Sequence, residues 1–179
     1  MTRTQLPKES VLVLGGARSG KSEYALQRAE GWGGKLAFLA TAQAKDEEMQ
    51  HRIATHQAQR NSRVWQTIEE PLDVVWRLKE CDERLDAVVL DCVTVWVSNA
   101  LLANKINELE HQIDELVEEI PLFSFHFLAV SNEVGLGLVP DNPLGREYRD
   151  VLGTVNKRLA QACHEVVFMA AGIPMRMKG

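Results

Sequence analysis

The sequence predicts an α/β protein built on a mostly parallel β-sheet with helices on both faces. Short, continuous apolar runs, which are typical of buried strands, alternate along the chain with apolar stripes at helical spacing. The clearest runs are residues 11–14, 87–90 and 125–130, and the clearest stripes lie over residues 106–120 and 144–162. Strands that are apolar throughout need helices on both faces of the sheet, and the intervening stripes supply them.

The first apolar run leads directly into Gly15-Gly16-Ala17-Arg18-Ser19-Gly20-Lys21-Ser22, which has the form G-x-x-x-x-G-K-S. This is the phosphate-binding P-loop motif, and it lies between a predicted strand and a predicted helix over residues 23–30, as the motif requires. Glycines allow backbone N–H groups to surround a phosphate, and the following helix directs its positive N-terminal end at the same anion. We expect Lys21 to contact the β- and γ-phosphates of a nucleoside triphosphate and Ser22 to ligate Mg²⁺. A chance glycine turn followed by Lys-Ser is disfavoured because both flanks fit the motif.

The other elements follow from the same two patterns. Further strands are expected over residues 35–40, 64–68 and 166–170, and further helices over residues 45–60 and 71–79. Pro71 is expected at the first helical position of its segment, where proline is favoured. Residues 93–102 are ambiguous, because their β-branched side chains favour a strand. We expect a helix there, since polar Ser98 and Asn99 interrupt the run and a strand directly precedes it.

Composition limits the classes of function. The 179 residues suit one domain, and a net charge of −5 without a basic run argues against nucleic acid as the main partner. No apolar run approaches the ~20 residues that span a bilayer, so we expect no membrane association. The cysteines are too far apart for a metal knuckle and indicate free thiols in the cytoplasm. We expect residues 1–10 to be a polar tail and residues 11–179 to form a single nucleotide-binding catalytic domain.

Polar residues follow several predicted strands, where ligands of parallel sheets bind. They are Thr41, Asp91, Asn132 with Glu133, and Gly172. Asp91 closes an apolar run, the position of the acidic residue that holds Mg²⁺ directly or through water in P-loop enzymes. The alternative for Asp91 is an N-cap of the next helix. Glu133 suits a role at the metal, a role as a base, or a solvated loop carboxylate.

The expected helix over residues 45–60 carries Arg52, His56 and Arg60 at four-residue steps, with Arg63 beyond it. Side chains at this spacing project onto one side of a helix, whereas His51 lies on another side. Arginine suits phosphate oxygens, and neutral imidazole is a nucleophile near pH 7. From the residues alone, a solvated charged face is the favoured interpretation of this stripe.

The order of these motifs resembles that of the bifunctional adenosylcobinamide kinase/adenosylcobinamide-phosphate guanylyltransferase family of cobalamin biosynthesis. Besides the P-loop, the resemblance rests on several segments in the family's order, and it covers nearly all of the chain beyond the first ten residues. The segments are Asp46-Glu47-Glu48-Met49 with Arg52, Ile53 and His56; Trp65 with Glu69-Glu70-Pro71; Leu90-Asp91-Cys92-Val93-Thr94 with Asn99; residues 131–140; and Arg146, Arg149, Asp150, Gly153, Asn156 and Arg158.

The resemblance implies a P-loop NTPase of the RecA-like, three-layer type. It implies an enzyme that phosphorylates adenosylcobinamide with GTP or ATP, then transfers GMP from GTP to that phosphate through a guanylylated histidine. His56 matches the histidine, and Arg52, Glu69 and Asp91 join the P-loop as nucleotide-binding residues, with Ser22 and Asp91 at Mg²⁺. It also implies a homotrimer. Two other readings remain open on the residues: another small-molecule P-loop kinase, and a non-catalytic nucleotide switch or RecA-like motor subunit.

Overall fold

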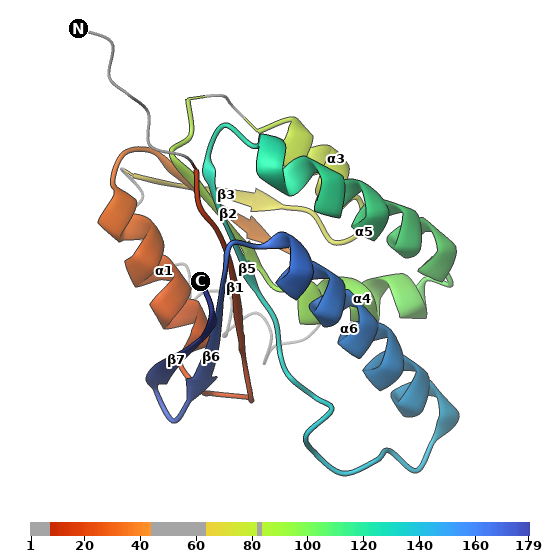
Figure 1. Cartoon of the computed structure of the whole chain (residues 1–179). Helices are drawn as coiled ribbons and strands as arrows, with labels where there is room; N and C mark the ends of the chain where they lie inside the picture. Colours follow the sequence, from red (N-terminus) through yellow and green to blue (C-terminus); the bar gives the residue numbers. More distant parts are fainter. Residues whose placement is uncertain (1–7, 44–63, 82–83) are drawn as a thin grey trace, which may run out of the picture.

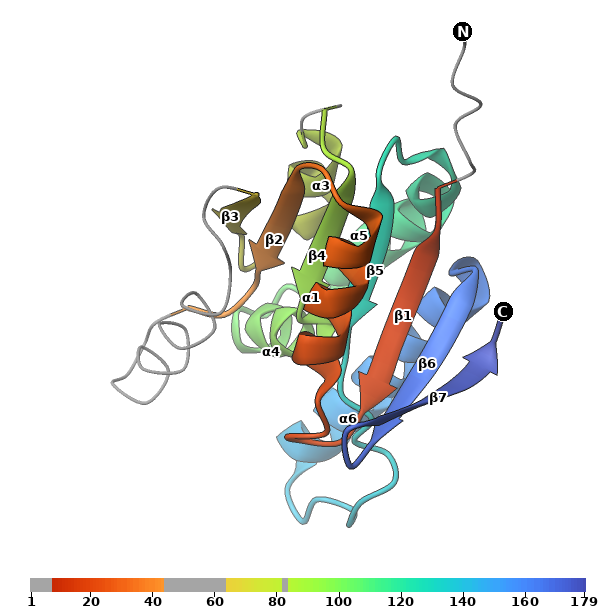
Figure 2. The same cartoon turned by 90° about the vertical axis from the view of Figure 1, so that its left-hand side faces the viewer.

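A seven-stranded sheet runs through the described part of the chain, which comprises residues 8–43, 64–81 and 84–179 of the computed structural model (Figures 1 and 2). Its strand order is β3-β2-β4-β5-β1-β6-β7. The parallel strands are β1 (Ser10–Gly15), β2 (Leu36–Ala40), β3 (Trp65–Glu69), β4 (Ala87–Asp91), β5 (His126–Val130) and β6 (Glu165–Ala170). The edge strand β7 (Ile173–Lys178) runs antiparallel to β6.

Of the described helices, α1 covers one face of the sheet, and the others cover the opposite face (Figures 1 and 2). The helices are α1 (Lys21–Trp32), α3 (Val74–Lys79), α4 (Val93–Leu102), α5 (Ile106–Glu119) and α6 (Pro143–Ala162), with a short 3₁₀ turn at Ile120–Leu122. The predicted α/β fold with a mostly parallel sheet between two helical layers is confirmed.

Successive residues of β1 face different helical layers, because side chains alternate along a strand. Val11 and Val13 pack in one core cluster with Ala25 of α1. Leu12 and Leu14 belong to the cluster under the helices of the other face. Both faces of the strand are therefore dry, and this explains why its sequence is apolar throughout rather than alternating.

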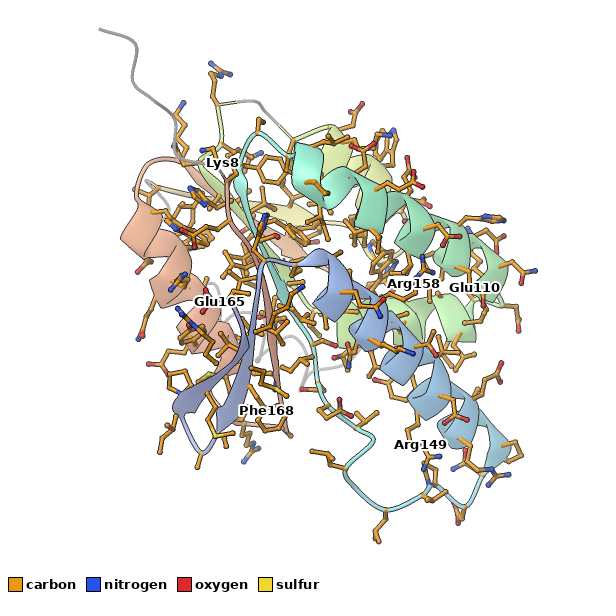
Figure 3. The ribbon with its side chains drawn as sticks, in the orientation of Figure 1. Lys8, Glu110, Arg149, Arg158, Glu165 and Phe168 are labelled. Atoms are coloured by element: carbon orange, nitrogen blue, oxygen red, sulfur yellow. The ribbon has the colours of Figure 1, made fainter. Side chains whose placement is uncertain are left out.

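The ambiguous segment over residues 93–102 is helical, as predicted. Trp96 of α4 is fully buried, and its Nε1 donates a hydrogen bond to the carbonyl oxygen of Leu72 at 2.9 Å. Next to it, α5 and α6 lie side by side, with Arg158 between them (Figure 3), and an ion pair between Asp114 and Arg158 joins the two helices at the surface. Burial between the sheet and these helices outweighs the intrinsic preference of β-branched residues for strands.

The helix predicted from Pro71 starts later than expected. Glu70 accepts hydrogen bonds at Oε1 from the backbone N–H groups of Leu72 and Asp73, each at 2.9 Å. These bonds hold residues 71–73 in a bend, so that α3 begins at Val74. A side chain that satisfies nearby backbone donors competes with the helix, and here it displaces the helix start by three residues.

The sequence prediction missed β7 altogether. All of its residues are exposed, and Pro174 lies within it. An edge strand tolerates proline because one side of its backbone faces no partner strand. Its apolar residues, Ile173, Met175 and Met177, alternate along the segment, but Pro174 within it argues against a strand.

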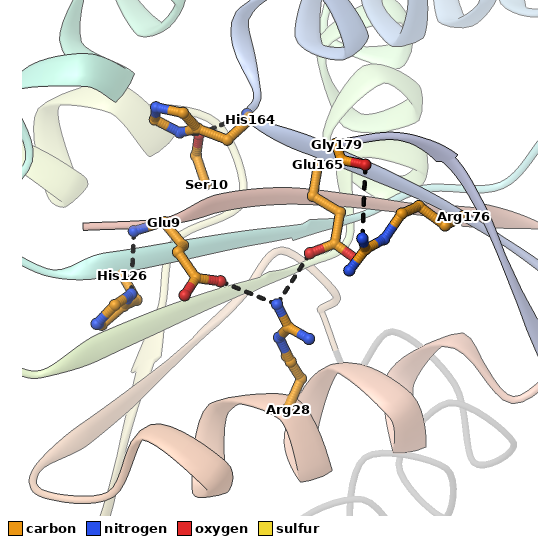
Figure 4. A network of polar contacts seen from close by, with 8 residues as sticks. All are labelled: Glu9, Ser10, Arg28, His126, His164, Glu165, Arg176 and Gly179. Atoms are coloured by element: carbon orange, nitrogen blue, oxygen red, sulfur yellow. Dashed lines mark hydrogen bonds and ion pairs between the residues drawn. The ribbon is translucent and has the colours of Figure 1, made fainter. Parts of the chain in front are cut away.

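The predicted boundary of the polar tail, after residue 10, lies too late in the chain. Ser10 is buried as the first residue of β1, and its hydroxyl lies 2.7 Å from Nδ1 of His164 (Figure 4). Arg28 of α1 bridges the carboxylates of Glu9 and Glu165, with both distances at 2.9 Å. Polar residues at this edge are thus part of the folded domain.

His126 belongs to the same cluster of polar contacts. Its Nδ1 accepts a hydrogen bond from the backbone N–H of Glu9 at 3.0 Å, so that nitrogen carries no proton in the folded protein. Its ring stacks on Trp32 at a centroid distance of 4.2 Å. Burial, followed by the charge of Lys8, lowers the pKa of His126 below its ordinary value of 6.5, and Arg28 adds to the lowering while Glu9 and Asp86 oppose it.

We expect this histidine to make the stability of the protein depend on pH. Because the folded pKa is lowered, the unfolded chain binds more protons just below pH 6.5. The free energy of unfolding should fall as the pH drops from about 7 to about 5. In His126→Phe, which keeps a ring opposite Trp32, this part of the pH dependence should disappear. Denaturant unfolding of both proteins across that range checks the expectation; parallel profiles would contradict it.

Candidate functional site

The P-loop begins where β1 ends, and its backbone requires glycine at two positions. Gly15 has a φ of 151°, and a Cβ there would lie 2.5 Å from the carbonyl oxygen of Met169 and 2.7 Å from Oγ of Ser19. Gly20 has a φ of 90° and forms the N-cap of α1. These positions bring the chain sharply from strand into helix, and the N-terminal end of α1 is directed at the loop.

Lys21 is the first residue of α1, and its side chain folds back over the loop. Only 8% of its surface is exposed, and its Nζ donates a hydrogen bond to the carbonyl oxygen of Gly16 at 2.5 Å. Nζ also lies 3.5 Å from Oγ of Ser19. The ammonium group is therefore fixed beside the loop, and its contact with the phosphates of a nucleotide stays a prediction.

Asp91 ends β4 at the same edge of the sheet. It is the register partner of Val130 in β5, and Val130 in turn pairs with Val13 of β1, two residues before the P-loop. The N-cap of α4 is Cys92 rather than Asp91, so the alternative assignment of Asp91 as the helix cap is wrong. Asp91 is the last residue of β4, at the edge of the sheet where the P-loop lies.

Cys92 reports the electrostatics of this edge. Burial, followed by the negative charge of Asp91, raises the pKa of its thiol to about 12, and the positive charge of Lys21 opposes the shift. The thiol therefore stays protonated, and the three cysteines, Cys81, Cys92 and Cys163, are all free of disulfides. The charges of Asp91 and Lys21 both act on the Cys92 thiol, as expected of groups that lie at the same edge of the sheet.

The residues fit Mg²⁺. No cluster of three or more His, Cys, Asp or Glu side chains in the described residues could enclose a metal ion. Mg²⁺ is typically held by one or two protein oxygens together with phosphate oxygens and water. The hydroxyl of Ser22, in the first turn of α1, and the carboxylate of Asp91 supply such oxygens.

Two polar residues, buried Thr41 and half-buried Asn99, fix the strand ends on the β2 side of Asp91. Thr41 is fully buried; its Oγ1 donates to the carbonyl oxygen of Cys92 at 2.8 Å and accepts from the N–H of Cys92 at 3.0 Å. Asn99 of α4 donates from Nδ2 to the carbonyl oxygens of Thr41 at 2.9 Å and Pro71 at 3.1 Å. These contacts join the end of β2, the start of α4 and the bend before α3, and they fix the backbone next to Asp91.

The turn after β5 lies against the P-loop. The backbone N–H of Glu133 donates to the carbonyl oxygen of Gly15 at 3.1 Å. The Glu133 carboxylate accepts from the N–H of Gly135 at 2.8 Å, so it shapes its own turn. Sequence reasoning placed Asn132 and Glu133 at this edge correctly. It named Thr94 and Asn156 only within the family's motifs and gave neither a role, although both hold the turn; the signal was the lone amide of Asn156 within the apolar stripe of α6.

No helix in the described ranges is both long and apolar enough to cross a membrane. A family model described as "Cobinamide kinase / cobinamide phosphate guanyltransferase" matches residues 11–177. The chain belongs to this family. The family predicted from the sequence is thereby confirmed.

Two curated relatives agree with this family assignment. The bifunctional adenosylcobalamin biosynthesis protein CobP of Pseudomonas aeruginosa is 41% identical over 168 residues, which cover 94% of this chain and 96% of the relative. The bifunctional adenosylcobalamin biosynthesis protein CobU of Salmonella typhimurium is 36% identical over 192 residues, covering 94% of this chain and 99% of the relative. Among solved structures, the RadB recombinase has a TM-score of 0.51 at 17% identity, covering 90% of this chain and 74% of that chain. This likeness supports the RecA-like P-loop NTPase fold.

Three other predicted site residues remain to be placed. Arg52 and His56 lie outside the described residues. Glu69 ends β3 at the same edge of the sheet, but β2, β4 and β5 separate it from β1 and the P-loop. The structure thus brings together the P-loop, Asp91 and the turn after β5, whereas Glu69 lies farther along the same edge of the sheet, at the end of β3.

Proposed function

We propose that this chain phosphorylates adenosylcobinamide with GTP or ATP and then transfers GMP from GTP to the resulting phosphate. The single observation that carries the proposal is a complete P-loop, with buried Lys21, within a family match that spans residues 11–177. The products of the second reaction are adenosyl-GDP-cobinamide and pyrophosphate. A net charge of −5 supports the view that neither nucleic acid nor a membrane is a partner, and free cysteines support a cytoplasmic location.

In the kinase step, the substrate hydroxyl attacks the γ-phosphorus and the bond to the β-phosphate oxygen breaks. Lys21 and the backbone N–H groups of the P-loop hold the phosphates and stabilise the charge that develops on them. Ser22 and Asp91 are the residues proposed to hold Mg²⁺. Bound Mg²⁺ would neutralise charge on the β- and γ-phosphate oxygens.

In the transferase step, we assign the nucleophile to His56. A ring nitrogen attacks the α-phosphorus of GTP, the bond to the β-phosphate breaks, and pyrophosphate leaves. The phosphate of the cobinamide then attacks the same phosphorus and releases the histidine, so that one difficult displacement becomes two easier ones. Arg52 and Glu69 are proposed to contact the nucleotide, on the strength of the family motif.

Product analysis tests the function. Purified protein incubated with adenosylcobinamide, Mg²⁺ and either ATP or GTP should give adenosylcobinamide phosphate. With GTP in excess, the phosphate should be converted to adenosyl-GDP-cobinamide, detectable by mass spectrometry. Nucleotide hydrolysis without any change in the corrinoid would instead support a nucleotide switch or motor subunit. A phosphate that never gains GMP would support a simple small-molecule kinase.

We also propose that the chain forms a homotrimer. Of the four tryptophans, Trp65 and Trp96 are buried and Trp32 is half-buried against His126, which leaves Trp76, 56% exposed, as a candidate for a subunit contact. Other large apolar side chains are exposed on two segments, and exposed apolar groups are common at subunit interfaces. They are Leu136, Leu138 and Val139 on the loop before α6, and Ile173, Met175 and Met177 on β7.

Light scattering at micromolar concentration should therefore give about three times the chain mass of 20.1 kDa. Replacing Leu136 and Leu138 together by serine, or Met175 and Met177 together by serine, should lower that mass if the corresponding segment forms the contact. A monomeric mass for the unmodified protein would contradict the proposal.

A further inference from the structure

We propose that Asn156 of α6 is a positioning residue of the kinase reaction, which holds the turn after β5 in place beside the P-loop. Asn156 is only 4% exposed, and its neighbours in the helix, Leu152, Val155 and Leu159, belong to the apolar core. A polar side chain is stable at such a position when it is fully hydrogen-bonded. The partners of Asn156 therefore indicate why an amide is present there.

Both ends of the Asn156 amide engage the turn. Its Oδ1 accepts a hydrogen bond from Oγ of Ser131 at 2.7 Å, and its Nδ2 donates to the carbonyl oxygen of Asn132 at 3.0 Å. From the opposite side, Oγ1 of Thr94 in α4 accepts from the N–H of Asn132 at 2.7 Å. The Thr94 and Ser131 hydroxyls lie 3.4 Å apart, which closes the network. Two helices thus hold the backbone of one residue of the turn, Asn132, through its N–H and its carbonyl oxygen.

The same turn is bonded to β1 and to the P-loop. The N–H of Ser131 donates to the carbonyl oxygen of Val13 at 2.9 Å, and the N–H of Glu133 donates to the carbonyl oxygen of Gly15 at 3.1 Å. Because β5 lies between β4 and β1, the turn stands between Asp91 and the phosphate-binding loop. A shift of the turn would therefore change the site at the place where the phosphoryl group is transferred.

The network engages the backbone of Asn132 but not its side chain. Its backbone N–H and carbonyl oxygen are both used, by Thr94 and Asn156, so the backbone of this residue is held on two sides. Its side-chain amide makes no hydrogen bond within the described residues, and the residue is half-buried at the strand end. A held backbone that carries an amide donor is the arrangement by which a protein stabilises charge developing in a transition state.

The expected consequence is a loss in kcat rather than in nucleotide binding. The ground-state triphosphate is held by the P-loop amides and Lys21, to which the network adds one backbone bond, at Gly15. Interactions that act only in the transition state change kcat and leave KM nearly unaltered. This inference rests on the proposed kinase activity.

Two pairs of variants test it. Thr94→Val keeps the shape of the side chain but removes the acceptor for Asn132; we expect kcat for adenosylcobinamide phosphorylation to fall by about 10-fold or more, with KM for GTP changed by less than about 2-fold. Thr94→Ser, which retains the hydroxyl, should restore most of the rate. Asn156→Leu should lower kcat in the same way, whereas Val155→Ala, at a buried apolar neighbour, should lower Tm and leave kcat unchanged.

A binding measurement separates positioning from a general loss of stability. In Thr94→Val and Asn156→Leu, the affinity for GDP should be retained, while the affinity for GDP with aluminium fluoride, a mimic of the transferring phosphoryl group, should fall. If both variants keep the unmodified kcat, or lose only Tm as Val155→Ala does, the network is structural and the inference is wrong. If the unmodified protein does not phosphorylate adenosylcobinamide at all, the proposed function fails instead.

Discussion

Replacement of Lys21 by alanine is expected to slow both the phosphorylation and the GMP transfer by about 10²-fold or more. The lysine is buried at the start of α1, and its ammonium group lies beside the loop that holds the phosphates. Both reactions break a bond within a bound triphosphate, so both depend on a fixed positive charge against the phosphate oxygens. A positive charge that is fixed before the reaction costs no reorganisation, which is why its loss has a large effect.

The rates of both reactions, measured on each isolated step, check this expectation. Lys79→Ala is the matched control, because Lys79 is a surface lysine that pairs with Glu115 and Glu119 on α5. Its removal should leave both rates within about 2-fold, since surface ion pairs contribute little. Normal kinase turnover in Lys21→Ala would refute the assignment of the P-loop as the phosphate site.

The second large effect is expected at His56. His56→Ala should abolish GMP transfer while much of the phosphorylation remains, because the nucleophile of the kinase step is the substrate hydroxyl. A histidine nucleophile must be unprotonated, and an ordinary imidazole loses its proton near pH ~6.5. The sequence places Arg52 and Arg60 four residues on either side, and neighbouring positive charges favour the neutral ring.

His51→Ala is the matched control, since it removes the same residue type from a nearby position in the sequence. It should retain both reactions. GMP transfer that persists in His56→Ala would mean that the nucleophile lies elsewhere. Loss of both reactions in a folded His56→Ala protein would mean that the histidine shapes a shared phosphate site, and the two-step mechanism would lose its support.

Much of this fold could be predicted from the sequence because its central strands are buried on both faces and its longest helices on one. The runs that became β1 and β4 are apolar, the run of β5 is apolar except for His126, and the stripes of α5 and α6 repeat over several turns. The failures have local causes. The carboxylate of Glu70 delays the start of α3, and β7 exposes all of its side chains. The first cause leaves no periodic pattern in the sequence, and in β7 the alternation of Ile173, Met175 and Met177 is masked by Pro174.

The candidate site could be predicted only in part for a different reason. The P-loop is contiguous, and Asp91 follows a strand that is easily recognised, so both were found. The network of Thr94, Ser131 and Asn156 joins the first turn of α4, the end of β5 and the middle of α6. Contacts between segments so distant in sequence depend on the packing of α4 and α6 over the sheet, which a single sequence does not specify.

The central claim, that a guanylylated histidine links the two reactions, is tested most directly by labelling. The protein is incubated with Mg²⁺ and GTP that is labelled at the α-phosphate, then denatured and freed of unbound nucleotide. We expect the label to stay on the protein, to be released by acid but not by base, as for a phosphoramidate, and to be absent from His56→Ala; γ-labelled GTP should leave none. A protein that catalyses GMP transfer yet carries no label, or whose label persists in His56→Ala, would contradict the account.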